Sequence, residues 1–456
     1  MRIKMGSFIR VMLVVGAFAV MAHAQDEGHS SLETNAALEH SIGGLLQPES
    51  LAFSPELART NYLDGGINVG TTFDDNALST ETNHVSNFNY SVMPHIALRQ
   101  SRGRVGWKIN YAAGFVASER YSSLNQGTHK LDVESVYRIS PHVTFTLRDN
   151  FAMTTGFFDQ LNQGTDMPAG TVLQRPNQSV VTPLAKQTAN LATGLVAYQF
   201  SNNSEIGASG TSYLSRFHDE QGGASLVDTD SQEAEVFYNH RVFGRDSLGV
   251  TYRFQRFTFS SLANDSLVQS VLATYTWRPH SNLAVSFFAG PQYRDSSSQF
   301  IQQTVTPQSI TLAWIPESRN AWSTAAGSSL NWNGERTSFL ANAARTINDG
   351  GGLLGAVELT SVDAAIRRQL TQVYSAQIGV TYGRNRALVD SAAPYSSVNG
   401  TIGSISLSRR FGTSFGFTAG YARAHQTQDS VSASNLVNNN RAWVSLSYDF
   451  SRPLGR

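Results

Sequence analysis

After about residue 60, nearly the whole chain repeats one pattern, in which apolar residues alternate with small or polar ones over about a dozen residues. A period of two predicts a β-strand with one apolar and one polar face. The stretch 104–117 shows it most clearly. There we expect one face to meet lipid, with Val105, Trp107, Ile109 and Tyr111, and the other to meet water, with Arg104, Lys108 and Asn110.

The first 24 residues have the parts of a secretory signal peptide. Arg2, Lys4 and Arg10 supply its positive region, residues 11–21 its apolar region, and Ala22-His23-Ala24 its cleavage site. We therefore expect export and a mature chain that begins at Gln25. The apolar run is too short for a membrane helix, and no later stretch reaches the roughly twenty apolar residues that such a helix needs.

Eighteen alternating segments lie between residues 62 and 450. They predict an all-β fold, a transmembrane antiparallel β-barrel of about 18 strands. An even number returns both termini to the periplasm, and one miscounted hairpin would leave sixteen. Short turns such as Ser140-Pro141 and Asn333-Gly334 alternate with longer polar connections. We expect outer loops at 155–186, 218–230, 295–319, 386–396 and 426–439.

A soluble β-sandwich is the competing all-β fold. Its strands average five or six residues, whereas a tilted membrane strand needs about nine to eleven. The segments of this chain match the longer class. We therefore expect a barrel in the outer membrane of a Gram-negative-type bacterium.

Two terminal segments lie outside the expected barrel of residues 62–450. We expect residues 25–61 to form a periplasmic leader, either floppy or folded back into the lumen as a partial plug, and residues 451–456 to form a periplasmic tail. The barrel-insertion machinery reads an aromatic residue at the end of a barrel. Tyr448 and Phe450 supply that residue, six or more positions before the end of the chain.

The polar face of the segments carries most of the charge. An arginine that faced lipid at the bilayer midplane would cost about 2 to 4 kcal/mol, so we expect these residues to line the lumen. The channel-lining candidates are Arg104, Lys108, Asp132, Glu134, Arg138, Glu233, Glu235, Arg241, Arg253, Arg278, Arg294, Arg409, Arg423 and Arg441. On the apolar face, aromatic residues near the strand ends suit the membrane interfaces, namely Trp107, Tyr137, Tyr252, Tyr275, Trp277, Trp332, Tyr382, Tyr421 and Tyr448.

Charge and motifs favour neither nucleic acid nor catalysis. Removal of the signal leaves 31 basic against 34 acidic residues, which gives no reason to expect a nucleic-acid partner. The chain has no cysteine and no nucleophile-elbow, zinc-protease or phosphate-loop motif. We expect no enzyme, cofactor or metal site. The acidic stretch Asp228, Asp230, Glu233 and Glu235 has the oxygen ligands that calcium prefers, but a solvated loop that leads into a lumen-facing strand explains it better.

One element resembles a known family. The first strand, Asn61 to Asn76, ends in Phe73-Asp74-Asp75-Asn76, and residues 252–257 alternate aromatic residues with arginine and glutamine. In these features the chain resembles the outer-membrane β-barrel porins that are found beside exopolysaccharide synthesis and export genes. The resemblance implies a role in moving polysaccharide across the outer membrane, and only Asp74, Asp75 and Asn76 match its motif.

Two functions follow from these observations. The first is a porin-like channel in outer-membrane lipid that passes hydrophilic solutes or supports exopolysaccharide export. The second is a structural or adhesive barrel, in which the lumen is plugged and the long outer loops bind a partner. A barrel enzyme of the phospholipase kind would need a Ser/His pair at the lipid-facing rim, and no sequence motif marks one.

Overall fold

We analysed a computed structural model of the chain. It describes residues 60–81, 84–122, 125–154, 177, 179–181, 185–218, 226–259, 264–306, 309–388, 396–429 and 434–454. The expected signal peptide (1–24) and nearly all of the expected leader (25–61) lie outside these residues.

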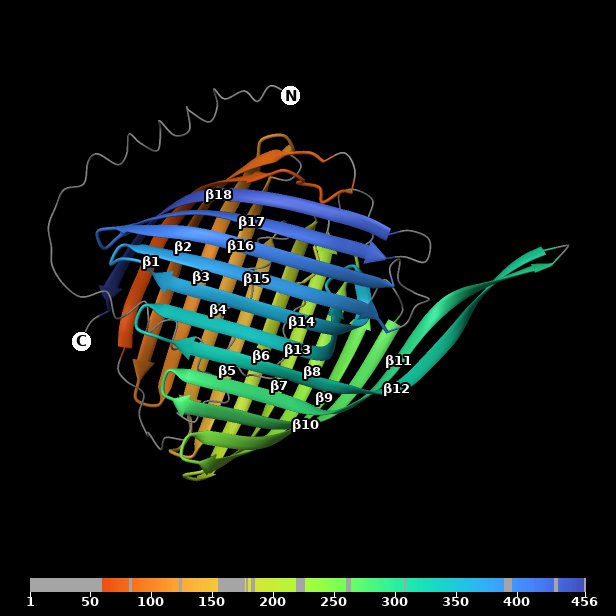
Figure 1. Ribbon diagram of the computed structural model, residues 1–456, viewed down its shortest axis with the longest axis horizontal. Coiled ribbons are helices and arrows are strands. Elements are labelled where there is room, and N and C mark those ends of the chain that lie inside the picture. The colour runs from red at the N-terminus through yellow and green to blue at the C-terminus, as the bar shows by residue number, and fades with distance from the viewer. Residues whose placement is uncertain are drawn as a thin grey trace. The chain divides into compact units, whose positions relative to one another are not determined.

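The described residues form one closed antiparallel barrel of 18 strands (Figure 1). Each strand pairs with its neighbours in the sequence, and β1 pairs with both β2 and β18, which closes the sheet. The expected fold class and strand number are confirmed. The strands are β1 (Thr60–Asp74), β2 (Asn87–Arg102), β3 (Val105–Ser118), β4 (Gln126–Arg138), β5 (Val143–Thr154), β6 (Lys186–Ser201), β7 (Ser204–His218), β8 (Thr229–Phe243), β9 (Asp246–Phe259), β10 (Asn264–His280), β11 (Leu283–Thr306), β12 (Ser309–Asn333), β13 (Thr337–Gly350), β14 (Leu354–Gln369), β15 (Tyr374–Ala387), β16 (Ser397–Phe411), β17 (Phe415–Asp429) and β18 (Ser434–Pro453).

Tight turns join the strands at one end of the barrel, as the sequence predicts. Gly103, Gly244 and Gly412 occupy three of these turns with positive φ angles of 59°, 47° and 62°. A residue with a Cβ atom adopts this left-handed backbone only with strain, which explains glycine at these positions. We call this end of the barrel inner and the opposite end outer.

The expected outer loop at 295–319 is wrong. β11 and β12 continue through it as a paired hairpin, with Thr306 opposite Ser309. This hairpin extends beyond the other strands (Figure 1). The segment contains Phe300, Ile301, Val305, Ile310 and other β-formers among its polar residues, and these favour a strand over a loop.

The last strand is longer than expected. β18 ends at Pro453, and Tyr62 of β1 pairs with that residue. Residues 451–453, which the sequence assigns to a tail, are therefore part of the barrel wall. Ser451 and Arg452 are polar and Pro453 lacks an N–H group. A prediction based on alternating hydrophobicity therefore ends the strand before them.

Candidate functional site

The outer surface of the barrel is apolar over most of its height. Large hydrophobic side chains alternate along nearly every strand and are two-fifths to half exposed, among them Val69, Ile96, Phe115, Val250 and Ile378. An exposed apolar band that runs around a closed barrel fits hydrocarbon, and water would disfavour it strongly. All nine aromatic residues expected at the membrane interfaces belong to this exposed set.

The inner wall is polar and carries rows of charged residues. In one row, Lys108 of β3 lies opposite Glu134 of β4, which lies opposite Arg148 of β5. A nitrogen of Arg148 lies 3.4 Å from a carboxylate oxygen of Glu134. The alternation within β3 that the sequence predicts thus places Lys108 inside the barrel and Trp107 outside it.

The most buried charges of the wall form a triad on β8 and β9. The Nε atom of Arg253 lies 2.7 Å from Glu235 and 3.8 Å from Glu233. The amide of Gln255 donates a hydrogen bond to Glu233 at 2.6 Å, and the hydroxyl of Ser209 donates one to Glu235. The three charged side chains are at most 7 % exposed, so this part of the wall is a charged surface covered from water.

Two of the fourteen lining candidates face outward. Arg423 is two residues from the exposed Tyr421, so the two share the outer face. Arg409 shares the outer face with the exposed Ile405 and Leu407, and its guanidinium lies over the rings of Tyr374 and Phe411.

The polarity of a side chain does not report its face at Arg409, two residues from the inner end of β16, or at Arg423, which follows the interface residue Tyr421 toward the outer end of β17. An outward arginine costs about 0 to 1 kcal/mol near the membrane interfaces, so charge does not report the face there. The positions on the inner parity are Lys108, Asp132, Glu134, Arg138, Glu233, Glu235, Arg241, Arg253, Arg278, Arg294 and Arg441, while Arg104 lies in the β2–β3 turn.

A segment of the β5–β6 connection lies inside the outer half of the barrel. The amide of Asn177 donates a hydrogen bond to the side chain of Asn385 on β15, at 2.6 Å. The side chain of Gln426 on β17 bonds both backbone groups of Val181, which is 1 % exposed. The sequence predicts that this long connection could either fold inward or cover the mouth, and its described residues 177 and 179–181 lie inward.

The β13–β14 hairpin end also turns into the barrel. Leu353, Leu354 and Val357 are at most 3 % exposed and belong to one buried cluster with Phe217 of β7 and Val398 of β16. Gly351 and Gly352 permit the turn, with φ angles of 63° and 90°. The outer half of the lumen is therefore narrowed by two separate elements.

Asp349 joins these two elements. Its carboxylate accepts hydrogen bonds from the backbone N–H groups of Asn177 and Gly351, and its carbonyl accepts one from the Asn177 side chain. β13 has left the wall after Arg345, so Asp349 lies outside the membrane-spanning part of the strand. Burial raises the pKa of this carboxyl from 3.8 to about 6, against the opposing effect of the backbone donors.

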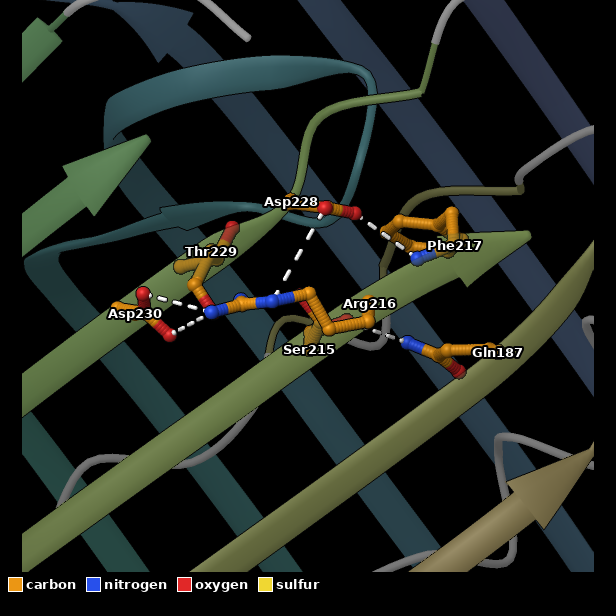
Figure 2. Close-up of polar contacts among 7 residues, drawn as sticks. All are labelled: Gln187, Ser215, Arg216, Phe217, Asp228, Thr229 and Asp230. Atoms are coloured by element: carbon orange, nitrogen blue, oxygen red, sulfur yellow. Dashed lines mark hydrogen bonds and ion pairs between the residues drawn. The ribbon is translucent and has the colours of Figure 1, made fainter. Parts of the chain in front are cut away.

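The acidic stretch of β8 is divided between the two faces of the sheet. Asp228 and Asp230 lie on the outer face with Arg216, whose guanidinium is 2.6 Å from Asp230 and 4.0 Å from Asp228 (Figure 2). Glu233 and Glu235 point inward to Arg253. The four carboxylates therefore do not form one calcium site. Within the described ranges, no group of three or more His, Cys, Asp or Glu residues is placed to hold a metal ion.

The motif behind the family resemblance closes the barrel at its outer end. Both carboxylate oxygens of Asp75 accept hydrogen bonds from Asn440 at 2.6 Å. Asn76 is fully buried, and its amide donates to the carbonyls of Thr80 and Asn438. These bonds fasten the loop after β1 to β18. The sequence pattern marks these residues, but their role depends on the β1–β18 pairing.

No helix of the described residues is long and apolar enough to cross a membrane.

No protein-family model and no curated protein matches the sequence. Among solved structures, the chain is similar to the outer membrane protein OpdK of Pseudomonas aeruginosa (9 % identity, 86 % of this chain and 99 % of that one, TM-score 0.40). It is also similar to OccAB3 of Acinetobacter baumannii (8 % identity, 86 % of this chain and 99 % of that one, TM-score 0.40). A further similar structure is P. aeruginosa OccK2 in complex with glucuronate (7 % identity, 87 % of this chain and 100 % of that one, TM-score 0.43).

Proposed function

We propose that the protein is an outer-membrane channel for small hydrophilic solutes, with a route that is narrowed near its outer end. The main support for this proposal is that the two faces of the closed barrel wall differ in polarity. An apolar exterior suits lipid, and an inner wall with the row of Lys108, Glu134 and Arg148 suits water and polar solutes. Single-chain barrels with an even strand number are typical of bacterial outer membranes.

Planar-bilayer recording of the refolded mature chain tests the channel. We expect discrete conductance steps, since a wall of 18 strands encloses more space than side chains alone fill. Ion-tight membranes at high protein load, with the barrel shown to be folded, would contradict an open channel.

The two inward elements set the size of the route. Asn385→Ala combined with Gln426→Ala removes the side chains that bond to Asn177 and Val181, so the conductance steps should increase. Asn239→Ala is the control, because Asn239 is also a buried asparagine of the inner wall but donates to Glu205 of the neighbouring strand. Unchanged steps in the double variant, or an equal increase in the control, would show that the segment of Asn177 and Val181 does not limit the route.

The long β11–β12 hairpin favours the adhesive alternative. Its strands have 24 and 25 residues and remain paired to the tip. If this hairpin binds a partner, replacing residues 298–317 with a two-residue turn should abolish cell-surface binding and leave conductance unchanged. The association with exopolysaccharide remains a prediction from the resemblance, and secretion of the polymer by a strain lacking the gene tests it.

A further inference from the structure

The barrel wall divides between β12 and β13. β12 pairs with β13 only from Ala326 to Asn333, whereas it stays paired with β11 as far as Ser309. Beyond Arg345, β13 turns inward with β14. Ile347 has the same parity as Arg345, yet it is 3 % exposed and packs in a cluster with the lumen-facing Phe257. The β11–β12 hairpin therefore continues away from the barrel, whereas β13 and β14 turn into the lumen.

An open apolar hollow lies at the foot of the division. Its volume is about 590 Å³, and residues of β9 to β14 line it. The lining includes Ala273, Phe287, Ala289, Ala326, Ala343 and Val362, all on the outward parity. Phe287 and Val362 are almost half exposed, so the hollow opens onto the lipid-facing surface.

Arginines border the hollow on its outer side. Thr360, which lines the hollow, lies between Arg345 of β13 and Arg384 of β15 in one row of paired residues. Two strand spacings separate the two arginines, which places their Cα atoms about 10 Å apart. Arg386 follows on the same face and lies opposite Glu358. Arg345 forms an ion pair with Glu358, which leaves this border with three arginines and one carboxylate.

Two other outward arginines near the outer end, Arg216 and Arg256, have carboxylates of their own. Arg216 pairs with Asp230, and Arg256 pairs with Asp265 at 3.3 Å. Arg384 and Arg386 are exposed and make no ion pair or hydrogen bond with the described part of the chain. Among the described residues, the next carboxylate of this face is Asp429 on β17, which accepts a hydrogen bond from Ser397.

We propose that the hollow and its arginine border bind a phosphate-bearing lipid of the outer leaflet. The acyl chain occupies the apolar hollow, and the phosphate contacts Arg384 with Arg386 and Arg345. Guanidinium groups bind phosphate by paired hydrogen bonds, and their long side chains reach the headgroup level from the wall. The proposal depends on the membrane placement in the proposed function, but not on solute passage.

Native mass spectrometry of the full mature chain in nanodiscs tests the proposal. The discs contain phosphatidylcholine with or without lipid A. We expect one lipid A per barrel to survive release from the disc, and no retained phosphatidylcholine. Arg384→Gln/Arg386→Gln should weaken lipid A binding by about tenfold per arginine. Arg256→Gln, which alters a paired outward arginine, should leave binding unchanged.

A second variant tests the hollow separately from the charge. Ala343→Trp fills the hollow with an apolar group that lipid tolerates, so it should reduce binding while all three arginines remain. Undiminished binding in either the double arginine variant or Ala343→Trp would overturn the site. Complete displacement of lipid A by millimolar inorganic phosphate would overturn the assignment to a lipid.

Lipid binding and conductance, measured on the same variants, test the lipid site and the channel separately. Heat-modifiable migration on gels confirms that each variant is folded. The double arginine variant should conduct as the wild type does, because its changes lie on the outer face. A barrel that binds lipid A and conducts nothing refutes the channel and supports the lipid site. A barrel that conducts but retains lipid A no better than phosphatidylcholine refutes the lipid site alone.

Discussion

Replacing Arg253 with methionine should destabilise the barrel strongly, because the change leaves two buried carboxylates without their cation. Arg253 lies 2.7 Å from Glu235 and 3.8 Å from Glu233, and their side chains are 5 %, 7 % and 1 % exposed. Methionine keeps much of the volume of the arginine side chain. The variant therefore isolates the loss of charge from the loss of packing.

The expected loss is about 3 to 5 kcal/mol, which is typical when one partner of a buried ion pair is removed. The matched control is Arg256→Met on the same strand. Arg256 pairs with Asp265 at 3.3 Å, but the two side chains are 54 % and 45 % exposed. Solvent screens such a pair, so the control should lose about 0 to 1 kcal/mol.

The assay is urea unfolding in lipid vesicles, followed by the fluorescence of the lipid-facing Trp107, Trp277 and Trp332. A third variant combines Arg253→Met with Glu233→Gln and Glu235→Gln. It should recover most of the lost free energy of unfolding, because the triad then contains no charged side chain. If Arg253→Met unfolds within about 1 kcal/mol of the wild type, or the triple variant unfolds no later than the single one, the triad is not the source of stability argued here.

Three further predictions address the wall, the outer end and the hairpin. Tyr111→Arg should cost about 2 to 4 kcal/mol and impair membrane folding, whereas Asn110→Arg should fold and shift ion selectivity toward anions; equal folding yields would contradict the assigned faces. The folded state binds the proton of Asp349 more tightly than the unfolded chain does, because the pKa of this carboxyl is raised from 3.8 to about 6. Protonated Asp349 therefore contributes about 3 kcal/mol to the free energy of unfolding below about pH 4, and this contribution is lost as the pH rises through about 6. Asp349→Asn should remove this dependence, and unfolding of both proteins at pH 4 and 7 checks it. Shortening the β11–β12 hairpin at residues 298–317 should leave the barrel folded, which heat-modifiable migration on gels measures.

The sequence alone determined the wall and most of its faces. Lipid and water lie on opposite sides of a membrane strand, so each strand must alternate, and the period is visible in residues such as Trp107 and Lys108. Closing the sheet required only an even count, and tight turns at Gly103 and Gly412 marked one end. The same reasoning placed most charged candidates on the inner parity.

The tertiary structure decided the faces of some residues near both ends of the barrel and the path of the wall at the outer end. Arg409 and Arg423 face outward because charge is inexpensive near an interface, so polarity stops reporting the face there. The alternating pattern marks the face of each residue but not its partner strand, so it cannot show that β13 parts from β12 after Arg345.

Asn177, which bonds to Asp349, and Val181, which bonds to Gln426, lie more than 170 residues from those partners in the chain. Such contacts depend on which parts of a closed sheet face each other across the lumen. The arginine border has the same origin, because Arg345, Thr360 and Arg384 are brought into one row by strand register. Local pattern fixes the face of a residue, but only the closed barrel fixes its neighbours.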